Sequence, residues 1–449
     1  MYAVIDGAVP PVGRVRVSGA KNSATRLLSA ALLSDERVEL SNFPTRLVDV
    51  GHKVNFSRHT GADISVDHHS ETVSVSADAV SSTLLTRDQY DVPIRTTYLL
   101  AAAQILRTGI ARIPYPGGCP IGGGSSGARG YDLHIMVWEQ LGATVRELED
   151  HIEITANRGL IGGTINFPIT TVGGTENALL CASVASGQTQ IFNAYITPEV
   201  HDLIALLRRM GANISVFGTS HIVVDGKGAA LSGAHMAVMP DRIEALTWIV
   251  YAILSGGNLT VEGVPFESME VPLIHIAQAG VDLFRNSNAV HVTPDCLSSG
   301  SVQPFELACG AHPGVISDMQ AFYVLLGLAG AGTSRVYDYR YPERIAFVDE
   351  LAKLVQGDHL AAERGKITVR GPATFKPGVA NSTDLRGSMA VVIAALCTEG
   401  RSVIQNVQMA LRGYNDLESK LSRLGSRITV FDDAPAPAEV KELLGASAR

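Results

Sequence analysis

The chain has 449 residues, of which 46% are hydrophobic and 18% are charged, and its formal net charge is −8. A chain of this length predicts two domains, and the composition is typical of a globular protein with a well-supplied core. The negative charge argues against a nucleic-acid-binding protein, because such proteins bind through an excess of lysine and arginine.

The cysteines and the apolar runs exclude further classes. The five cysteines are odd in number and none lies in a CxxC pair, so neither a disulfide framework nor a zinc site is expected. No apolar run approaches the roughly 18–20 residues that cross a bilayer, and the N-terminus lacks the regions of a signal peptide. We therefore expect a cytoplasmic protein with no membrane partner.

The chain repeats one pattern six times. Each repeat has an apolar helical run, a polar or glycine break and a β-branched strand, and most continue with a second amphipathic helix. The opening segments are, in chain order, LLSAALLSDERVEL, LLAAAQILRTGIARI, ALLCASVASGQTQIF, WIVYAILSGGNLTVEG, FYVLLGLAGAGTSRVY and VVIAALCTEGRSVIQNV. Glycine after a helix is typical of a C-cap, and alternating Val, Ile and Thr indicate half-buried strands. Three repeats per domain predict two similar α/β domains with a cleft between them, joined within Val238–Ala245.

Polar residues stand just before the first helix of every repeat. They are Lys21 with Asn22, Arg95, Gly173 with Gly174, Asp241 with Arg242, Asp318, and Asp384 with Arg386. Helix N-termini offer unpaired N–H groups and a favourable field for anions, so converging helices would gather these residues into an anion site. The alternative is that each residue is a separate helix cap, which suits the aspartates. Lysine and arginine gain nothing as caps, so the set as a whole favours a function.

A glycine-rich segment, PYPGGCPIGGGSSGARGYDLH, runs from Pro114 to His134. It could be a disordered linker, a phosphate-binding loop, or a mobile lid that carries a reactive thiol. A flexible linker needs no reactive side chains, yet this segment contains Cys119, Arg129 and Asp132 besides its final histidine. These residues favour the lid.

At these motifs the chain resembles the enolpyruvyltransferases, specifically the UDP-N-acetylglucosamine 1-carboxyvinyltransferase branch. The resemblance runs almost end to end and is carried by SGAKNSATRLLSAALLS, PGGCPIG, VGGTENALL, PDRIEA, SDMQAFYVLL, STDLRGS and RGYNDLESKLSRLG. It implies two inside-out α/β domains, each of three βαβαββ units, with the active site in the cleft between them. It assigns residues 21–239 to the first domain, which carries the Cys119 lid, and residues 1–20 with 240–449 to the second.

The resemblance also implies the reaction. Phosphoenolpyruvate would donate its enolpyruvyl group to a hydroxyl of a uridine nucleotide, and phosphate would leave by addition and elimination. The expected acceptor is the 3-hydroxyl of UDP-N-acetylglucosamine, as in peptidoglycan synthesis for the cell wall. In this assignment Cys119 is the general acid and the target of fosfomycin, Asp318 assists deprotonation of the acceptor, and Lys21 and Arg412 complete the catalytic set. No metal and no cofactor are needed, because cationic side chains neutralise the phosphate.

The remaining site residues are carried over position by position. Phosphoenolpyruvate would be bound by Lys21, Arg129, Arg344, Arg386 and Arg412, with Arg95 and Asp384 in support. The nucleotide would be bound by Asn22, Arg129, Tyr131, Asp132, Leu133, His134, Thr171, Val172, Gly173 and Asp318.

The chain departs from the family pattern at several places. Nine residues separate Cys119 from Arg129 where about four are usual, and Gly123–Gly127 looks inserted. Gly130 replaces a proline and Thr197 stands where an acidic residue is expected. Two alternatives therefore stay open: transfer to the 3′-hydroxyl of UMP in nucleoside-antibiotic biosynthesis, and a catalytically silent uridine-nucleotide-binding regulator. The sequence leaves the oligomeric state and the pathway open.

Overall fold

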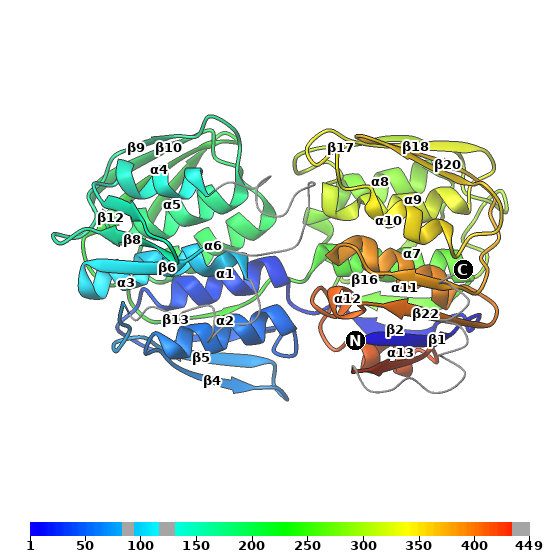
Figure 1. Ribbon diagram of the computed structural model, residues 1–449, viewed down its shortest axis with the longest axis horizontal. Coiled ribbons are helices and arrows are strands. Elements are labelled where there is room, and N and C mark those ends of the chain that lie inside the picture. Colours follow the sequence, from blue (N-terminus) through cyan, green and yellow to red (C-terminus); the bar gives the residue numbers. More distant parts are fainter. Residues whose placement is uncertain (83–93, 116–130, 433–449) are drawn as a thin grey trace. The chain divides into compact units, whose positions relative to one another are not determined.

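The chain folds as two compact units (Figure 1). The computed structural model describes residues 1–82, 94–115 and 131–432. Unit 1 holds residues 1–18 and 240–432, and the described residues between 19 and 239 form unit 2. The domain division expected from the sequence starts two residues later, at 21, and has the same boundary after residue 239.

Unit 2 contains three sheets and six α-helices among its described residues. The helices are α1 (Lys21–Ala31), α2 (Val48–His59), α3 (Ala101–Thr108), α4 (Asp132–Gln140), α5 (Val172–Val184) and α6 (Pro198–Arg209), with the 3₁₀-helix η2 (Arg95–Leu100) leading into α3. The sheets have the strand orders β13-β3-β5-β4, β6-β8-β7 and β11-β12-β10-β9. The strands are β3 (Val38–Ser41), β4 (Asp63–Asp67), β5 (Thr72–Ser76), β6 (Ile110–Pro114), β7 (Thr144–Glu147), β8 (His151–Thr155), β9 (Thr164–Asn166), β10 (Ser186–Phe192), β11 (Asn213–Phe217), β12 (His221–Lys227) and β13 (Ala234–Ala237).

Unit 1 also contains three sheets, ordered β15-β16-β14-β2, β17-β18-β20-β19 and β21-β22-β1-β23. Its strands are β1 (Tyr2–Asp6), β2 (Val12–Arg16), β14 (Asn258–Glu262), β15 (Phe284–Arg285), β16 (Ala289–Val292), β17 (Glu306–Cys309), β18 (Thr333–Asp338), β19 (Leu360–Glu363), β20 (Lys366–Arg370), β21 (Val379–Asn381), β22 (Arg401–Gln405) and β23 (Arg427–Phe431). Its helices are α7 (Arg242–Ser255), η3 (Phe266–Ser268), α8 (Glu270–Gln278), η4 (Ser317–Met319), α9 (Gln320–Leu328), α10 (Ala346–Ala352), α11 (Leu385–Leu396), α12 (Gln408–Leu411) and α13 (Leu417–Arg423).

The N-terminal residues complete two sheets of unit 1. Strand β1 lies between β22 and β23, and Tyr2 pairs with Gln405 on one side and Phe431 on the other. Strand β2 runs parallel to β14, with Val12 opposite Asn258. Residues at the two ends of the chain therefore share one sheet.

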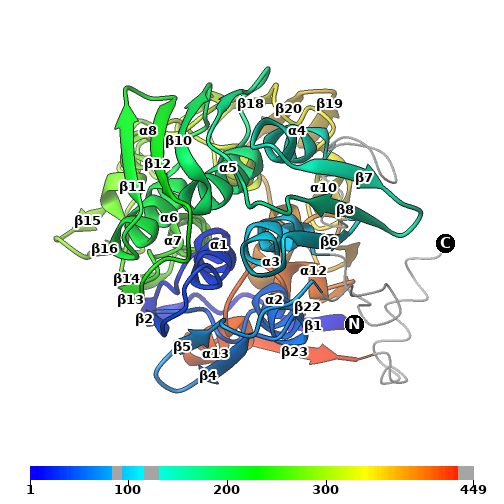
Figure 2. The same cartoon turned by 90° about the vertical axis from the view of Figure 1, so that its left-hand side faces the viewer.

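The first helices of the repeats form the interior of each unit. Every residue of α9 and α11 is buried, and so is α5 from Gly174 to Val184. A helix that is apolar on all faces belongs in a core, and the sheets lie outside these helices, as Figure 2 shows for α1, α3 and α5 of unit 2. The α/β fold class expected from the sequence, with helices inside and sheets outside, is confirmed. None of the helices in the described residues is long and apolar enough to span a membrane.

Gly19, the first residue of unit 2, is closely packed against the backbone of that unit. A Cβ added at Gly19 would lie 1.9 Å from the carbonyl oxygen of Asn42, whereas one added at Gly51, within α2, would meet nothing within 4 Å. We predict that Gly19→Ala lowers the free energy of unfolding by about 1–3 kcal/mol or more, because backbone must move. Gly51→Ala, the matched control, should raise it by about 0.5–1 kcal/mol. Urea denaturation measures both, and equal midpoints for the two variants would contradict the prediction.

Candidate active site

The predicted polar residues lie at the N-termini of the buried helices, and in unit 1 their side chains meet. Asp384 is the N-cap of α11, and its carboxylate accepts hydrogen bonds from the N–H groups of Arg386 and Gly387. Asp241 caps α7 in the same way. The capping interpretation is therefore right for both aspartates. Both also form ion pairs, so capping is not their whole role.

Arg344 joins two of these helix ends. Its Nη1 lies 2.7 Å from Oδ1 of Asp318, beside α9, and its Nη2 lies 2.8 Å from Oδ1 of Asp384. The Arg344 side chain is only 4% exposed. Burial lowers the pKa of its guanidinium, but the carboxylates of Asp384 and Asp318 raise it more, so the pKa lies above its ordinary value. Arg344 thus stays charged and fixes both carboxylates.

Arg386, in the first turn of α11, makes a second set of buried contacts. Its Nη1 donates to the carbonyl of Gly413 at 3.2 Å, its Nη2 lies 3.6 Å from Oδ2 of Asp241, and its guanidinium carbon lies 5.1 Å from the ring centre of Tyr414. The Nε of Arg386 is buried and has no hydrogen-bond partner in the part of the chain that the structure describes. Arg412 is the neighbour of Gly413 in sequence and is half-buried. Unit 1 therefore brings the Arg386 side chain to the segment that carries Arg412.

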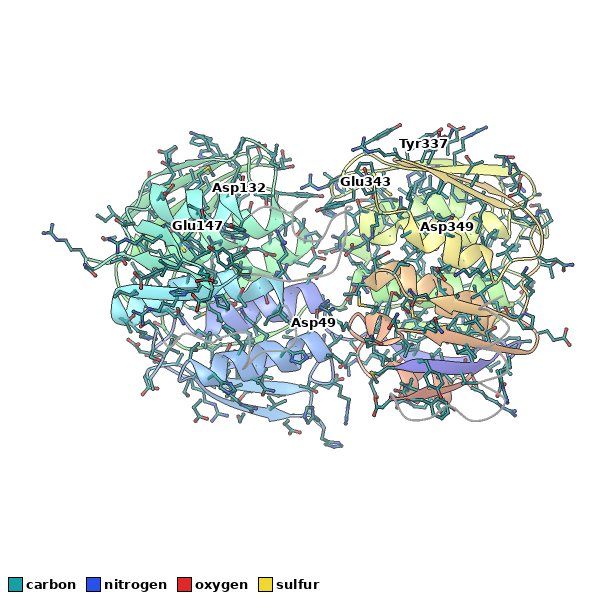
Figure 3. The ribbon with its side chains drawn as sticks, in the orientation of Figure 1. Asp49, Asp132, Glu147, Tyr337, Glu343 and Asp349 are labelled. Atoms are coloured by element: carbon teal, nitrogen blue, oxygen red, sulfur yellow. The ribbon has the colours of Figure 1, made fainter. Side chains whose placement is uncertain are left out.

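Unit 2 places Lys21 at the first turn of α1, as the sequence predicts. Its Nζ lies 2.7 Å from Oδ2 of Asp49, at the start of α2 (labelled in Figure 3). Both side chains are 12% exposed, so this ion pair is only partly screened by water. Deeper along α1, Arg26 bonds both carboxylate oxygens of Glu176 on α5 at 2.9 Å. These pairs fix the orientation of α1, where Asn22 also lies.

The predicted nucleotide segment opens α4. Tyr131 precedes the helix and its hydroxyl donates to Oε2 of Glu147 on β7 at 2.7 Å. This hydrogen bond, together with burial, raises the pKa of Tyr131 to about 12. The ring of Tyr115, at the end of β6, packs against Tyr131 with 5.5 Å between centres. Asp132, labelled with Glu147 in Figure 3, is exposed and Leu133 is half-buried.

His134 is the buried member of this segment. Its ring stacks on Tyr98 of η2 at 4.2 Å, and burial together with the charge of Arg95 lowers its pKa to about 3. His134 is therefore neutral at physiological pH. A Cβ added at Gly173 would lie 3.5 Å from the His134 ring, so the N-terminus of α5 also reaches this stack.

The start of α5 is capped by Thr171, whose hydroxyl accepts from the N–H of Gly174 at 3.2 Å. Thr171, Val172 and Gly173 are half-buried. The structure thus brings the turn at 171–174, the histidine of α4 and the start of η2 together within unit 2. Cys119 and Arg129 lie outside the described residues, so their roles stay predictions.

The residues that contribute here but were not singled out from the sequence include Asp49, Tyr98, Glu147 and Tyr414. Tyr98 lies three residues after Arg95, a spacing that places two side chains on one helix face, and Tyr414 belongs to the RGY motif. Both could have been found by their spacing. No local pattern marks Asp49 or Glu147, because their partners lie on other elements.

Comparison with known proteins identifies the family of the chain. The chain matches the model of the EPSP synthase (3-phosphoshikimate 1-carboxyvinyltransferase) family over residues 5–421. The chain belongs to this family. It is 35% identical over 424 residues to a UDP-N-acetylglucosamine 1-carboxyvinyltransferase of Beijerinckia indica, covering 93% of this chain and 95% of the relative. It is 36% identical over 433 residues to the enzyme of the same name from Koribacter versatilis, covering 95% of each.

Solved structures of the EPSP synthase family agree. The enolpyruvyl transferase NikO from Streptomyces tendae has a TM-score of 0.84 and 26% identity to this chain, covering 95% of it and 98% of NikO. An EPSP synthase from Acinetobacter baumannii has a TM-score of 0.69 at 15% identity, covering 96% and 99%, which shows the fold alone. The expected family and enzyme class, enolpyruvyl (1-carboxyvinyl) transfer, are confirmed by these matches.

The Arg344 ion pairs generate a stability prediction. We expect Asp384→Ala to lower the free energy of unfolding by about 3–5 kcal/mol, because it removes a buried partner of Arg344. Asp384→Asn keeps an acceptor for the N-cap bonds, so its loss should be smaller by about 1 kcal/mol. The matched control is Glu343→Ala, which breaks the exposed pair of Glu343 with Arg364 and should cost less than about 1 kcal/mol. Denaturant unfolding of the three variants measures their losses in free energy of unfolding. A loss in Glu343→Ala as large as that in Asp384→Ala would contradict the prediction.

The buried His134 generates a pH prediction. An unfolded histidine gains a proton below about pH 6.5, whereas folded His134 stays neutral down to a pKa of about 3. In between, the unfolded chain binds more protons, so this residue makes stability fall as pH falls, by at most about 1.4 kcal/mol per pH unit. Wild type should therefore lose up to about 2 kcal/mol more than His134→Gln between pH 7.5 and 5.0 in denaturant titrations. Equal losses in the two proteins would show that His134 is not held neutral.

Proposed function

We propose that this protein transfers the enolpyruvyl group of phosphoenolpyruvate to a hydroxyl of a uridine nucleotide and releases phosphate. The observation that carries the proposal is the cluster of Asp318, Arg344, Asp384 and Arg386 at the N-termini of buried helices in unit 1. A carboxylate fixed beside guanidinium groups suits a reaction that removes a hydroxyl proton next to a polyanion. The relatives named UDP-N-acetylglucosamine 1-carboxyvinyltransferase support the 3-hydroxyl of that nucleotide as the acceptor.

Phosphoenolpyruvate carries a carboxylate and a phosphate, so its binding requires several cations. Lys21, Arg129, Arg344, Arg386 and Arg412 are the proposed ligands, with Arg95 and Asp384 in support. Each charge-assisted hydrogen bond contributes roughly 1.5–3 kcal/mol, and several together offset the desolvation of the anion. The Nε of Arg386, which lacks a partner among the described residues, is a donor of the kind that this binding needs.

Asp318 is the proposed acceptor of the nucleotide's hydroxyl proton. Its carboxylate is held by Arg344 at 2.7 Å and its side chain is 27% exposed, so one of its faces remains accessible. An oriented carboxylate contributes to general base catalysis through its fixed position. Cys119 is proposed to deliver a proton to the methylene carbon of phosphoenolpyruvate, and Lys21 and Arg412 to neutralise the departing phosphate.

The nucleotide is proposed to bind at residues 131–134 and 171–174 of unit 2. The N-terminus of α5, a helix of 13 residues, presents backbone N–H groups that suit the phosphates of the nucleotide. His134 is neutral, so it offers a ring surface and a hydrogen bond and no charge. Asn22 and Asp318 are the proposed contacts to the sugar.

A second acceptor, UMP, is favoured by two observations on the sequence. The segment between Cys119 and Arg129 is longer than in the family pattern by Gly123–Gly127, which lies outside the described residues. A longer segment could fill the space that the N-acetylsugar leaves when the acceptor is smaller. In addition, the acidic residue expected at 197 is Thr197, whose hydroxyl caps α6. Position 197 therefore carries a neutral hydroxyl where the family pattern has a carboxylate.

Phosphate release from phosphoenolpyruvate tests the proposal. We expect release with UDP-N-acetylglucosamine, a loss of most activity in Cys119→Ser, and retained activity in Cys119→Asp because a carboxylic acid also donates a proton. Release with UMP alone would establish the second acceptor. No release with either nucleotide, together with nucleotide binding seen by calorimetry, would make the protein a silent binding relative and refute the proposal.

A further inference from the structure

Lys53 on α2 is a fully buried lysine that the proposed mechanism does not use. Its exposed fraction is 0%, and its Nζ donates a hydrogen bond of 2.6 Å to the backbone carbonyl of Thr96. Lysine is among the residues least often fully buried, because removing its ammonium from water is costly. Within the described residues no carboxylate forms an ion pair with Lys53; burial and the nearby charge of Arg26 both lower its pKa well below the ordinary value. A methionine would fill the same space without this penalty.

The partner of Lys53 belongs to the first turn of η2. This 3₁₀-helix begins at Arg95, and its N-cap residue Ile94 offers no side-chain hydrogen bond. The side chains of Thr97 and Tyr98, which follow Thr96, do not fix the turn either. Their hydroxyls are buried and have no hydrogen-bond partner in the described part of the chain. The bond from Lys53 is thus a tertiary hydrogen bond that holds this turn against α2.

The position of this turn sets the position of Arg95. Arg95 precedes Thr96 in this turn and lies in the same 3₁₀-helix as Tyr98, which stacks on His134, and its charge helps to lower the pKa of His134. On α2, Asp49 lies one helical turn before Lys53, which places both residues on one face. Asp49 holds Lys21 by its ion pair. One face of α2 therefore contacts two segments that carry proposed substrate-binding cations.

We propose that Lys53 is a positioning residue: its hydrogen bond to Thr96 holds the start of η2 so that Arg95 meets an anionic phosphate or carboxylate group of a substrate. This inference rests on the proposed function. The anionic group could belong to phosphoenolpyruvate or to the nucleotide, and kinetics with each substrate varied in turn distinguish the two. Lys53 itself touches no substrate in this scheme and acts through Arg95.

A double-mutant cycle tests the proposal. The four proteins are wild type, Lys53→Met, Arg95→Gln and the double variant, with kcat and KM measured for both substrates and Tm for each protein. We expect Lys53→Met to raise KM for one substrate by about fivefold to tenfold, the effect of losing one well-placed hydrogen bond, with kcat changed by less than about threefold. Because Lys53 acts through Arg95, the KM of the double variant should be no higher than that of Arg95→Gln alone.

The control is Ser57→Ala on the same helix, which removes a buried hydrogen bond to the carbonyl of Lys53; within the described part of the chain Ser57 forms no hydrogen bond to η2. It should change Tm without changing either KM. If the increases in KM of the two single variants multiply in the double variant, Lys53 does not act through Arg95 and the positioning role is overturned. The same holds if Lys53→Met lowers Tm but leaves both KM values unchanged. If Lys53→Met does not fold, Lys53→Gln takes its place in the same cycle. Absence of phosphate release by wild type would instead refute the proposed function.

Discussion

A helix that is buried on every side can present polar groups only at its ends, and both units of this protein are built on such helices. In α9 and α11 no residue is exposed, and the polar side chains begin where the helices begin. The N–H groups that lack partners at these ends need acceptors. Asp384, Asp241 and Thr171 supply them from the protein. The polar groups of the candidate site are thereby confined to the N-terminal ends of the inner helices.

The two units satisfy this constraint differently. Unit 1 uses a chain of alternating charges, in which Arg344 lies between Asp318 and Asp384, and Arg386 lies beside Asp241. Each buried charge is compensated by a fixed partner, so the positions of all of them are coupled. Unit 2 has two ion pairs along α1, Lys21 with Asp49 and Arg26 with Glu176, and neutral groups at the turn of α5, where an uncharged histidine stacks on a tyrosine. Both arrangements hold side chains in place before any substrate arrives.

The sequence predicted the inner helices and their polar first residues, because apolar periodicity and capping are local patterns. It also predicted the α/β class and the family. It could not predict which side chains meet. Arg344 and Asp384 are 40 residues apart and are joined only by the packing of α10 against α11. The bond of Tyr131 to Glu147 depends on how a strand lies beside a helix. Lys53 reads as an ordinary surface lysine in a helix with basic and polar neighbours, and only its burial reveals otherwise.

The place of β1 between β22 and β23 has a consequence for how the protein is made. The described residues of unit 2 all lie between 19 and 239, so this unit can fold as soon as residue 239 has left the ribosome. Asp6 of β1, by contrast, cannot pair with Arg401 and Arg427 until those residues have been synthesised. At roughly 5–20 residues per second, the first strand stays without its neighbours for on the order of 20–80 seconds. During that interval its unpaired edges are open to other chains, so β1 is protected only once β22 and β23 have been synthesised.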